Sequence, residues 1–147
     1  MSKDKDEDLK PLPQSAVLPY RQSDRGPEIL LVTSSDTGRW VPPKGNIEEG
    51  MSAQDSAAKE AYEEAGISGK VEKRRLGRYV YRKSEVKGGH LCRVDLFAMQ
   101  VEKIEEAWPE MTLRHRQWMP AEEAAKAVAE PSLAALITDF AESFKRG

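Results

Sequence analysis

Three glutamates in the segment KEAYEEAGI, at residues 59–67, lie at positions i, i+3 and i+4, as Glu60, Glu63 and Glu64. Each residue of an α-helix turns about 100°, so these side chains share an arc of roughly 100°. Like charges this close repel one another, and a bare helix gains nothing from them. A hard divalent cation with oxygen ligands would reverse that penalty. The segment therefore predicts a helix that carries a magnesium site for phosphate chemistry.

The sequence also predicts where this helix begins and ends. Ser52 suits the N-cap, with Asp55 at the third helical position in an arrangement like a capping box. Gly66 suits the left-handed residue that follows a helix C-terminus. A stripe of small side chains, spaced by four residues on a different face from the glutamates, consists of Ala57, Ala61 and Ala65. We interpret this stripe as close packing against the core.

The size and composition favour one soluble domain. A chain of 147 residues with 39% apolar and 33% charged residues can bury a self-sufficient core. No apolar run approaches the roughly 20 residues that span a bilayer, and residues 1–10 lack the apolar segment of a signal peptide. The single Cys92 cannot form an internal disulfide, which fits a reducing compartment. We therefore expect a cytoplasmic protein without a membrane partner.

The order of elements predicts an α/β fold. Residues 1–13 are charged and then broken by two prolines, so we expect a disordered lead-in before a single domain at 14–147. Apolar and β-branched runs predict strands at 14–20, 28–33, 39–41, 71–83, 90–101 and 117–119. Two more helices are expected, one opened by Pro120 and one by Pro131. Strands interrupted by one helix and followed by two others indicate an α/β/α sandwich with a mixed central sheet.

Charge is distributed unevenly along the chain. Residues 70–93 hold nine lysines and arginines against two glutamates, a charge of +7, which leaves −9 for the rest of a chain whose total is −2. A basic stretch near a carboxylate-metal site would attract a polyanionic substrate. The alternative is a pair of strands whose basic side chains simply face water. Both interpretations stay open at this point.

Residues 45–67 resemble the Nudix hydrolase signature, G-x5-E-x7-R-E-U-x-E-E-x-G-U, where U is aliphatic. The matching positions are Gly45, Glu60, Glu63, Glu64, Gly66 and Ile67. Two positions depart, because Met51 replaces the first glutamate and Lys59 replaces the arginine. The resemblance assigns these two positions to an ion pair that steadies the loop against the helix. Since both ends have changed together, we interpret this as an altered brace rather than a dead site.

The resemblance extends to residues 14–140. The segments VTSS and RWVPPKG before the signature, and WPE and RHRQW after it, resemble diphosphoinositol polyphosphate and diadenosine polyphosphate phosphohydrolases. This implies Mg²⁺-dependent hydrolysis of a diphosphate linkage, X-P-P-Y giving X-P and P-Y, with Mn²⁺ as a substitute metal. It implies Glu60 and Glu64 as first-choice ligands, aided by the backbone carbonyl of Lys44. Glu63 either completes the metal cluster or acts as the base on a metal-bound water.

The same resemblance places substrate contacts at Ser35, Arg39, Lys44, Gly45, Arg93 and Arg116. Arginine offers a planar fork to phosphate oxygens, and lysine offers a mobile point charge. Arg93 falls within an apolar strand, where an unpaired charge is costly, so it needs either Asp95 on the same strand face or a bound anion. For Arg116 a surface role is an equal alternative.

Three functions remain open from the sequence. The first is an Mg²⁺-dependent pyrophosphohydrolase acting on diadenosine polyphosphates or diphosphoinositol polyphosphates. The second is a binding or regulatory module that has lost turnover, which Met51 and Lys59 would support. The third is a pyrophosphatase of nucleotide sugars such as ADP-ribose, which the signature alone permits. We expect a small-molecule polyphosphate as partner rather than nucleic acid, and a monomer or homodimer.

Overall fold

Strand β1 (Leu12–Ser23) runs through the centre of the sheet. Its residues 14–19 are buried without interruption, as expected for a strand covered on both faces. It pairs antiparallel with β2 (Gly26–Thr33) and parallel with β7 (Leu91–Ile104), so the sheet is mixed. The computed structural model describes residues 10–146. Residues 1–9 of the expected lead-in lie outside the described residues, whereas Leu12 and Pro13 belong to β1.

Five shorter strands complete an eight-stranded sheet. β3 (Trp40–Val41) and β8 (Arg116–Pro120) pair with β2, and β4 (Lys44–Asn46) pairs with β1. β5 (Ile67–Val71) and β6 (Gly77–Arg82) both pair with the fourteen-residue β7. The single strand expected at 71–83 is therefore wrong. A strand already begins at Ile67 and ends at Val71, and a second strand begins at Gly77. The two strands pair with different parts of β7, which is long enough for both, and the charged residues 72–75 lie between them.

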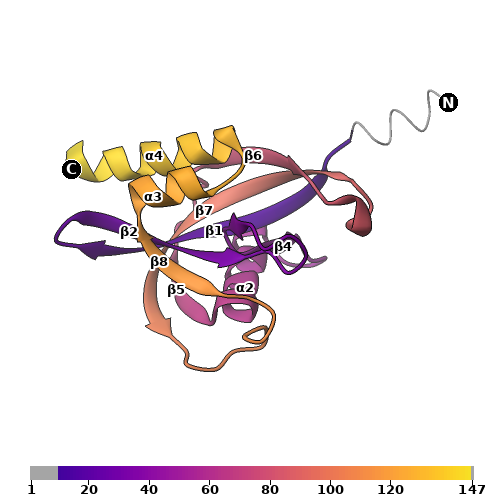
Figure 1. Cartoon of the computed structure of the whole chain (residues 1–147), viewed down its shortest axis with the longest axis horizontal. Helices are drawn as coiled ribbons and strands as arrows, with labels where there is room; N and C mark the ends of the chain where they lie inside the picture. Colours follow the sequence, from indigo (N-terminus) through magenta and orange to yellow (C-terminus); the bar gives the residue numbers. More distant parts are fainter. Residues whose placement is uncertain (1–9, 147) are drawn as a thin grey trace.

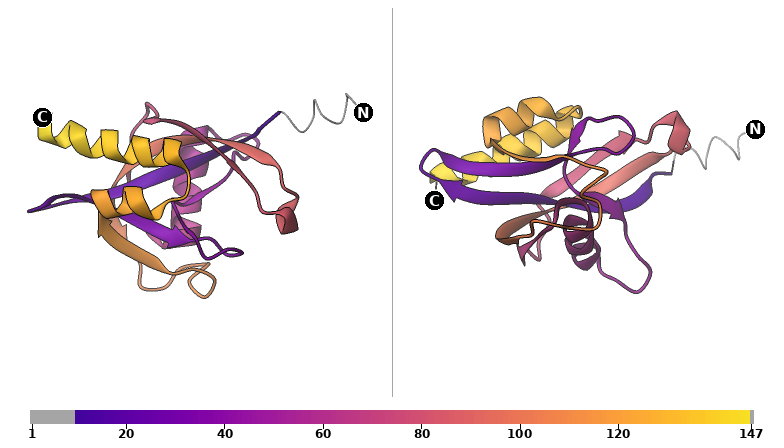
Figure 2. Two further views of the ribbon diagram at one scale, coloured as in Figure 1. Left: turned by 45° about the horizontal axis from the view of Figure 1, so that its top comes forward. Right: turned by 60° about the horizontal axis from the view of Figure 1, so that its bottom comes forward.

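Helices cover both faces of the sheet, which confirms the α/β/α sandwich. Helix α2 (Ala53–Ala65) lies on one face, and α3 (Ala121–Ala127) and α4 (Pro131–Arg146) lie on the other (Figure 1) (Figure 2). Side chains of β1 alternate between the two layers, since Val17 packs in the core on the α2 face and Leu18 in the core on the α3 and α4 face. A short 3-10 helix, η1 (Glu85–Lys87), lies in the β6–β7 connection and was not expected.

The expected ends and packing face of α2 are confirmed. The Ser52 hydroxyl accepts a hydrogen bond from the Asp55 N–H at 3.0 Å, and Gly66 adopts φ +67°. The alanine stripe is fully buried against the sheet, at Ala57, Ala61 and Ala65. Among the helices of residues 10–146, none has the length and apolar character needed to cross a membrane.

Candidate active site

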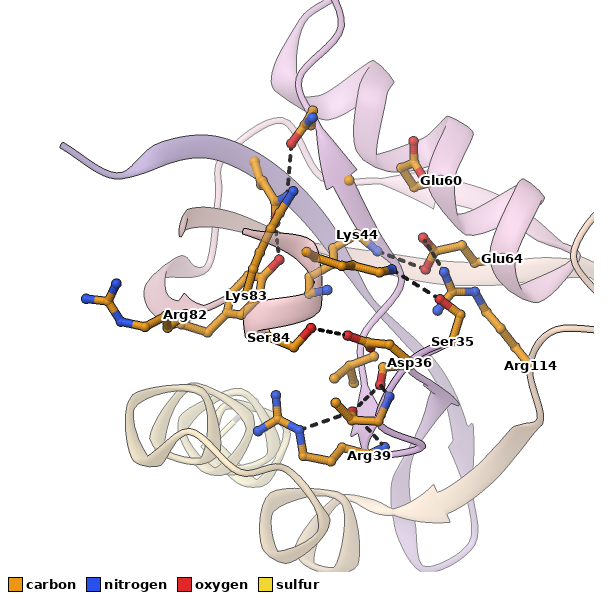
Figure 3. A pocket seen from close by; sticks show the side chains of 18 of the residues that line it. Ser35, Asp36, Arg39, Lys44, Glu60, Glu64, Arg82, Lys83, Ser84 and Arg114 are labelled. Atoms are coloured by element: carbon orange, nitrogen blue, oxygen red, sulfur yellow. Dashed lines mark hydrogen bonds and ion pairs between the residues drawn. The ribbon is translucent and has the colours of Figure 1, made fainter. Parts of the chain in front are cut away.

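A cavity of about 380 Å³ opens between α2, the loop at residues 34–39 and the strand β6 with its following turn (Figure 3). Six of the residues expected from the sequence line it, namely Ser35, Arg39, Lys44, Gly45, Glu60 and Glu64. Three others, Glu63, Arg93 and Arg116, are not among its lining residues. The structure therefore brings together two of the three glutamates with the loop that approaches the signature.

Glu64 is the most buried of the carboxylates, with 5% of its surface exposed. One of its oxygens accepts the backbone N–H of Lys44 at 3.3 Å, and the other lies 3.4 Å from an Nη of Arg114. Burial raises the pKa of Glu64 to about 8, although the charges of Arg114 and Lys44 oppose that rise. This carboxylate is therefore poorly hydrated, and the positive charges beside it stabilise its ionised form.

Glu60 reaches the same place one turn earlier on α2. Burial, and then the charge of Glu63, raise its pKa above the ordinary value. A Cβ atom at Gly45 would collide with the Glu60 carboxyl group. Any larger residue at position 45 would therefore displace the Glu60 carboxylate from its place against the β4 backbone.

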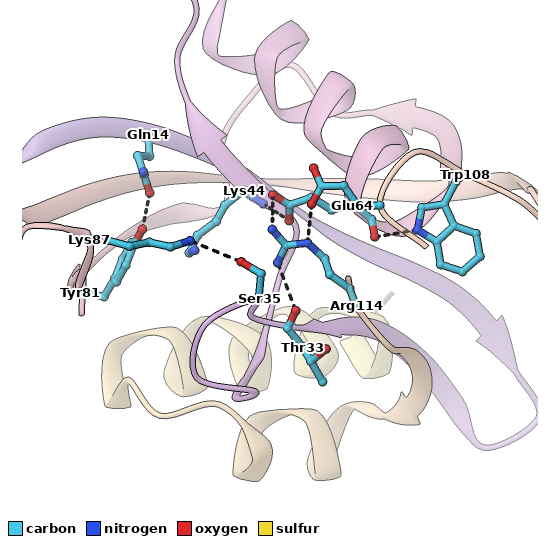
Figure 4. Close-up of polar contacts among 10 residues, drawn as sticks. Gln14, Thr33, Ser35, Lys44, Glu64, Tyr81, Lys87, Trp108 and Arg114 are labelled. Carbon is cyan, nitrogen blue, oxygen red and sulfur yellow. Dashed lines mark hydrogen bonds and ion pairs between the residues drawn. The ribbon is translucent and has the colours of Figure 1, made fainter. Parts of the chain in front are cut away.

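Lys44 links the carboxylates to the cationic part of the cavity. Its ammonium lies 4.6 Å from the centre of the Tyr81 ring, and burial lowers its pKa. The Tyr81 hydroxyl in turn donates to Gln14 at 2.7 Å (Figure 4). The Lys44 backbone therefore contacts the carboxylate side of the cavity at Glu64, and its side chain contacts the opposite part at Tyr81.

The loop-to-helix brace exists, but with a partner that the sequence analysis missed. The Lys59 ammonium lies 2.7 Å from a carboxylate oxygen of Glu48, and 3.7 Å from one of Glu63. The Glu48 N–H also donates to the Ser56 hydroxyl at 3.0 Å. Glu48 lies three residues before Met51, so the acidic residue of this ion pair comes earlier in the loop than the signature glutamate would. Glu63 contacts Lys59 in this structure.

Arg93 does not pair with Asp95, so that hypothesis is wrong. Asp95 forms an ion pair with Arg78 at 2.6 Å, from its neighbouring position on β6. The Nε atom of Arg93 is buried and has no hydrogen-bond partner among the described residues. The strand pairing of Arg78 and Asp95 could not be read from the sequence because it depends on the register of β6.

Arg116 holds the end of α2. It donates to the carbonyl oxygens of Ala65 and Glu105, each at 2.7 Å, and its guanidinium lies 3.8 Å from the centre of the Trp108 ring. These contacts place Arg116 in the support of the site. The arginine of this segment that lines the cavity is Arg114, two residues earlier. The sequence signal was the repeated arginine in RHRQW, which does not say which of the two points inward.

The basic stretch contributes to the cavity only in part. Of its nine basic residues, three line the cavity, namely Arg82, Lys83 and Lys87. The turn that follows β6 contacts the loop at 34–39, since Ser84 donates to Asp36 at 2.6 Å (Figure 3) and Lys87 donates to Ser35 at 3.3 Å (Figure 4). The stretch is therefore divided, because these three residues face the cavity whereas Lys70, Lys73, Arg74, Arg75 and Arg78 are exposed. Attraction of a polyanionic substrate stays a prediction.

The carboxylates of this cavity fit a Mg²⁺ site in which the protein supplies few ligands and water supplies several. Among the described residues, no three His, Cys, Asp or Glu side chains lie close enough together to hold a metal ion. Mg²⁺, however, is commonly bound by one or two carboxylates, with waters and substrate phosphates completing an octahedral shell. Glu60 and Glu64, beside a cation-lined cavity, provide two such carboxylates.

Comparison with known proteins identifies the class. The chain matches the NUDIX domain family over residues 11–140. It is 31% identical over 123 residues to Nudix hydrolase 16, mitochondrial, of Arabidopsis thaliana, which covers 80% of this chain and 68% of that protein. The chain therefore belongs to the Nudix hydrolase family, as the signature indicated.

Two further proteins are similar over most of this chain. Diphosphoinositol polyphosphate phosphohydrolase 3-alpha of Mus musculus is 34% identical over 116 residues, covering 77% of this chain and 66% of that protein. The crystal structure of a C. elegans Ap4A hydrolase shares the fold with a TM-score of 0.73 at 19% identity, covering 92% of this chain and 99% of that one. Several other Arabidopsis thaliana relatives are about twice as long as the matched region, which spans 50% to 55% of their length.

Proposed function

We propose that this Nudix hydrolase is an Mg²⁺-dependent enzyme that cleaves diphosphate linkages in highly phosphorylated small molecules. The observation that carries the proposal is one cavity in which two buried or partly buried carboxylates adjoin many cationic groups. The cations that line it are Arg39, Lys44, Arg82, Lys83, Lys87 and Arg114. Besides Glu60 and Glu64, the carboxylates of Asp36, Glu48 and Glu130 also line the cavity, so six cations face five acids. The two charges of a bound Mg²⁺ would give the excess of positive charge that attracts a polyanion.

Each group has a role in this proposal. Glu60, Glu64 and the backbone carbonyl of Lys44 would hold Mg²⁺, with Mn²⁺ as a substitute. A metal held there would supply Lewis-acid chemistry at the phosphoryl group and would lower the pKa of water. Arg39 and the Lys44 ammonium bind and orient the polyphosphate, with Ser35 and Gly45 beside them. Glu63 is a candidate base only if its carboxylate turns from Lys59 toward the cavity.

The names of the relatives support two substrate classes. The mouse relative is named for diphosphoinositol polyphosphates, and the C. elegans structure for Ap4A. We propose both classes as substrates to be tested, for a monomer or homodimer. A cytoplasmic location remains a prediction, because some plant relatives are named as mitochondrial and another as chloroplastic.

The first test measures kcat/KM along a series of substrates at two salt concentrations. We expect kcat/KM to rise from three to five or six phosphates in the diadenosine series, and to fall with salt more steeply for the longer members. Arg39→Ala and Lys44→Ala should flatten that rise. A profile that peaks at ADP-ribose and ignores salt would favour the nucleotide-sugar alternative, and binding without cleavage of any diphosphate would favour the binding module.

The second test concerns the metal ligands. Glu64→Gln should abolish Mg²⁺ binding in calorimetry and Mg²⁺-dependent hydrolysis, while circular dichroism shows an unchanged fold. Glu122→Gln, an exposed residue of α3 outside this cavity, is the matched control. Wild-type turnover of Glu64→Gln at limiting Mg²⁺ would contradict the ligand assignment.

A further inference from the structure

The five acidic residues that line the active-site cavity differ in whether they already have partners. Asp36 and Glu48 each bond a neighbouring side chain, at 2.6 Å and 2.7 Å. Glu60 and Glu64 are the proposed metal ligands. The fifth acid, Glu130, is partly buried, and its carboxylate forms no hydrogen bond or ion pair with a described residue. Its oxygens are therefore free to accept hydrogen bonds from a ligand.

Glu130 reaches the cavity from the helical layer opposite to the metal carboxylates. It directly precedes α4, and its backbone carbonyl accepts the Ala134 N–H of the first turn at 3.0 Å. Helix α2, which carries Glu60 and Glu64, lies on the other face of the sheet (Figure 1). The positive end of the α4 dipole favours a negative charge at this position. The cavity therefore receives carboxylates from both layers, and only those from α2 are proposed to hold metal.

A buried hydroxyl without a partner lies in the cavity wall near Glu130. Tyr79 lines the cavity with 2% of its surface exposed, and its hydroxyl has no hydrogen-bond partner among the described residues. Burial, and then the negative charge of Glu130, raise the pKa of this hydroxyl well above its ordinary value, so it stays protonated. The Tyr81 ring, which also lines the cavity, is centred 6.4 Å from the Tyr79 ring. This part of the wall is therefore aromatic, with one neutral hydroxyl and one acid.

These groups fit a flat, uncharged part of a ligand that donates hydrogen bonds. A carboxylate only accepts hydrogen bonds, and aromatic side chains pack well against a planar ring. The amino group of a nucleobase is a donor on such a ring. An inositol polyphosphate carries phosphates around its ring instead, so its anionic oxygens would meet the Glu130 carboxylate as like charges. The wall near Glu130 therefore suits a nucleotide better than an inositol polyphosphate.

We propose that Glu130 is a specificity-determining residue, whose carboxylate accepts a hydrogen bond from the amino group of a nucleobase and so selects dinucleoside polyphosphates over diphosphoinositol polyphosphates. This inference rests on the proposed function, because it places the substrate phosphates between Glu130 and the metal ligands. It decides between the two substrate classes that the relatives suggest. The cations of the cavity bind phosphate, and Glu130 contacts the uncharged end of the substrate.

The experiment measures, by calorimetry, how tightly the full chain binds two nucleotides that differ in one amino group. The probes are adenosine triphosphate and purine riboside triphosphate, which lacks the amino group, both without Mg²⁺. Because the two nucleotides carry the same phosphates, a change in the general charge of the cavity affects them equally. We expect wild type to bind adenosine triphosphate on the order of 10- to 100-fold more tightly, as for one charge-assisted hydrogen bond. Inositol hexakisphosphate is the third probe.

Two variants of Glu130 and one control test the assignment. Glu130→Met removes the acceptor at similar size, so the preference for the amino group should disappear. Glu130→Gln keeps a neutral acceptor, so a preference of roughly 3- to 10-fold should remain. Both should bind inositol hexakisphosphate several-fold more tightly, because a like charge is gone. Asp36→Asn is the matched control, since Asp36 also lines the cavity but already has a partner. It should leave the preference for the amino group unchanged.

The outcomes separate this inference from the proposed function. The inference is overturned if wild type binds the two nucleotides equally or binds neither, if the preference survives undiminished in the folded Glu130 variants, or if Asp36→Asn loses it as well. If circular dichroism shows that Glu130→Met is unfolded, the smaller preference of Glu130→Gln decides alone. A wild type that cleaves no diphosphate with Mg²⁺ contradicts the proposed function, whereas an amino-group preference that depends on Glu130 still supports the base contact. A wild type that cleaves diphosphoinositol polyphosphates more efficiently than diadenosine polyphosphates overturns the inference and leaves the proposed function standing.

Discussion

The two ends of α2 are held in different ways. At the N-terminal half the cap and the ion pair are exposed, since Ser52 caps the helix from the surface and the Lys59–Glu48 pair has side chains 47% and 41% exposed. Single part-buried hydrogen bonds, at Ser56 and Gln54, add to them. At the C-terminal end, four successive carbonyl oxygens each accept a hydrogen bond from the segment at 105–116. The last carbonyls of a helix have no partner inside it, and this segment supplies them.

At the C-terminal end of α2, each carbonyl oxygen has a different donor. Glu63 accepts from the Glu110 N–H at 3.0 Å, Glu64 from the Trp108 indole at 2.9 Å, and Gly66 from the Glu105 N–H at 2.8 Å. Arg116 binds the carbonyl of Ala65 and places its charge at the negative end of the helix dipole. Glu64 lies in this last turn. Of the two departures from the Nudix signature, Met51 precedes the helix and Lys59 lies at its middle, where an exposed ion pair contributes little.

The largest effect is expected from a methyl group added at the C-terminal end. Gly66 and Gly50 both have positive φ, +67° and +83°, and they flank α2 on opposite sides. A Cβ at Gly66 would lie 2.8 Å from Trp108 and 2.9 Å from Arg116, whereas at Gly50 nothing lies within 4 Å. Both Gly→Ala changes cost about 1–2 kcal/mol for the backbone conformation. Gly66→Ala should cost about 1–3 kcal/mol more, because it overpacks the contact with 105–116.

Urea unfolding of the two variants measures this difference directly. The free energy of unfolding should fall clearly further for Gly66→Ala than for Gly50→Ala, and its Mg²⁺ affinity should fall as well, because Glu64 shifts with the helix end. Equal losses in the two variants would mean that the segment at 105–116 yields to the new methyl group and does not fix the helix.

A middle-sized effect is expected from a single hydrogen bond of that segment. Trp108→Phe removes the indole donor to the Glu64 carbonyl but keeps an aromatic ring beside Arg116. The free energy of unfolding should fall by about 1 kcal/mol. Trp118→Phe is the control, since that ring also stacks with an arginine, Arg21 at 4.2 Å, and its indole has no hydrogen bond to a described residue. A similar loss in both variants would assign the effect to ring size alone.

The same contrast explains which features the sequence could predict. Helix α2, its Ser52 cap and its Gly66 end depend on residues within one or two turns, so local rules predicted them. Other features depend on how separate segments meet in the fold. These are the orientation of Arg114 in RHRQW, the Lys59–Glu48 ion pair, and the strand boundaries at Val71 and Gly77. Trp108 bonds a carbonyl 44 residues away, and Arg114 one 81 residues away. Because no local sequence pattern carries that information, the sequence analysis missed Arg114 and Glu48 as residues of the site and of the brace.

The smallest effect is expected at the N-terminal half, from the altered brace. Glu48→Gln and Lys59→Met should each lower the melting temperature less than Trp108→Phe does, because the pair is exposed and screened by solvent. Met51→Glu together with Lys59→Arg restores both signature residues, yet it should change kcat/KM little, since Glu48 already pairs with position 59.

The informative variant combines these two changes with Glu48→Gln. If the Glu48 brace is equivalent to the signature one, this triple variant recovers the small loss of melting temperature that Glu48→Gln causes alone, with kcat/KM as in wild type. A wild type that turns over slowly and a double variant that becomes an efficient hydrolase would show instead that the brace at Glu48 does not substitute for the one at position 51.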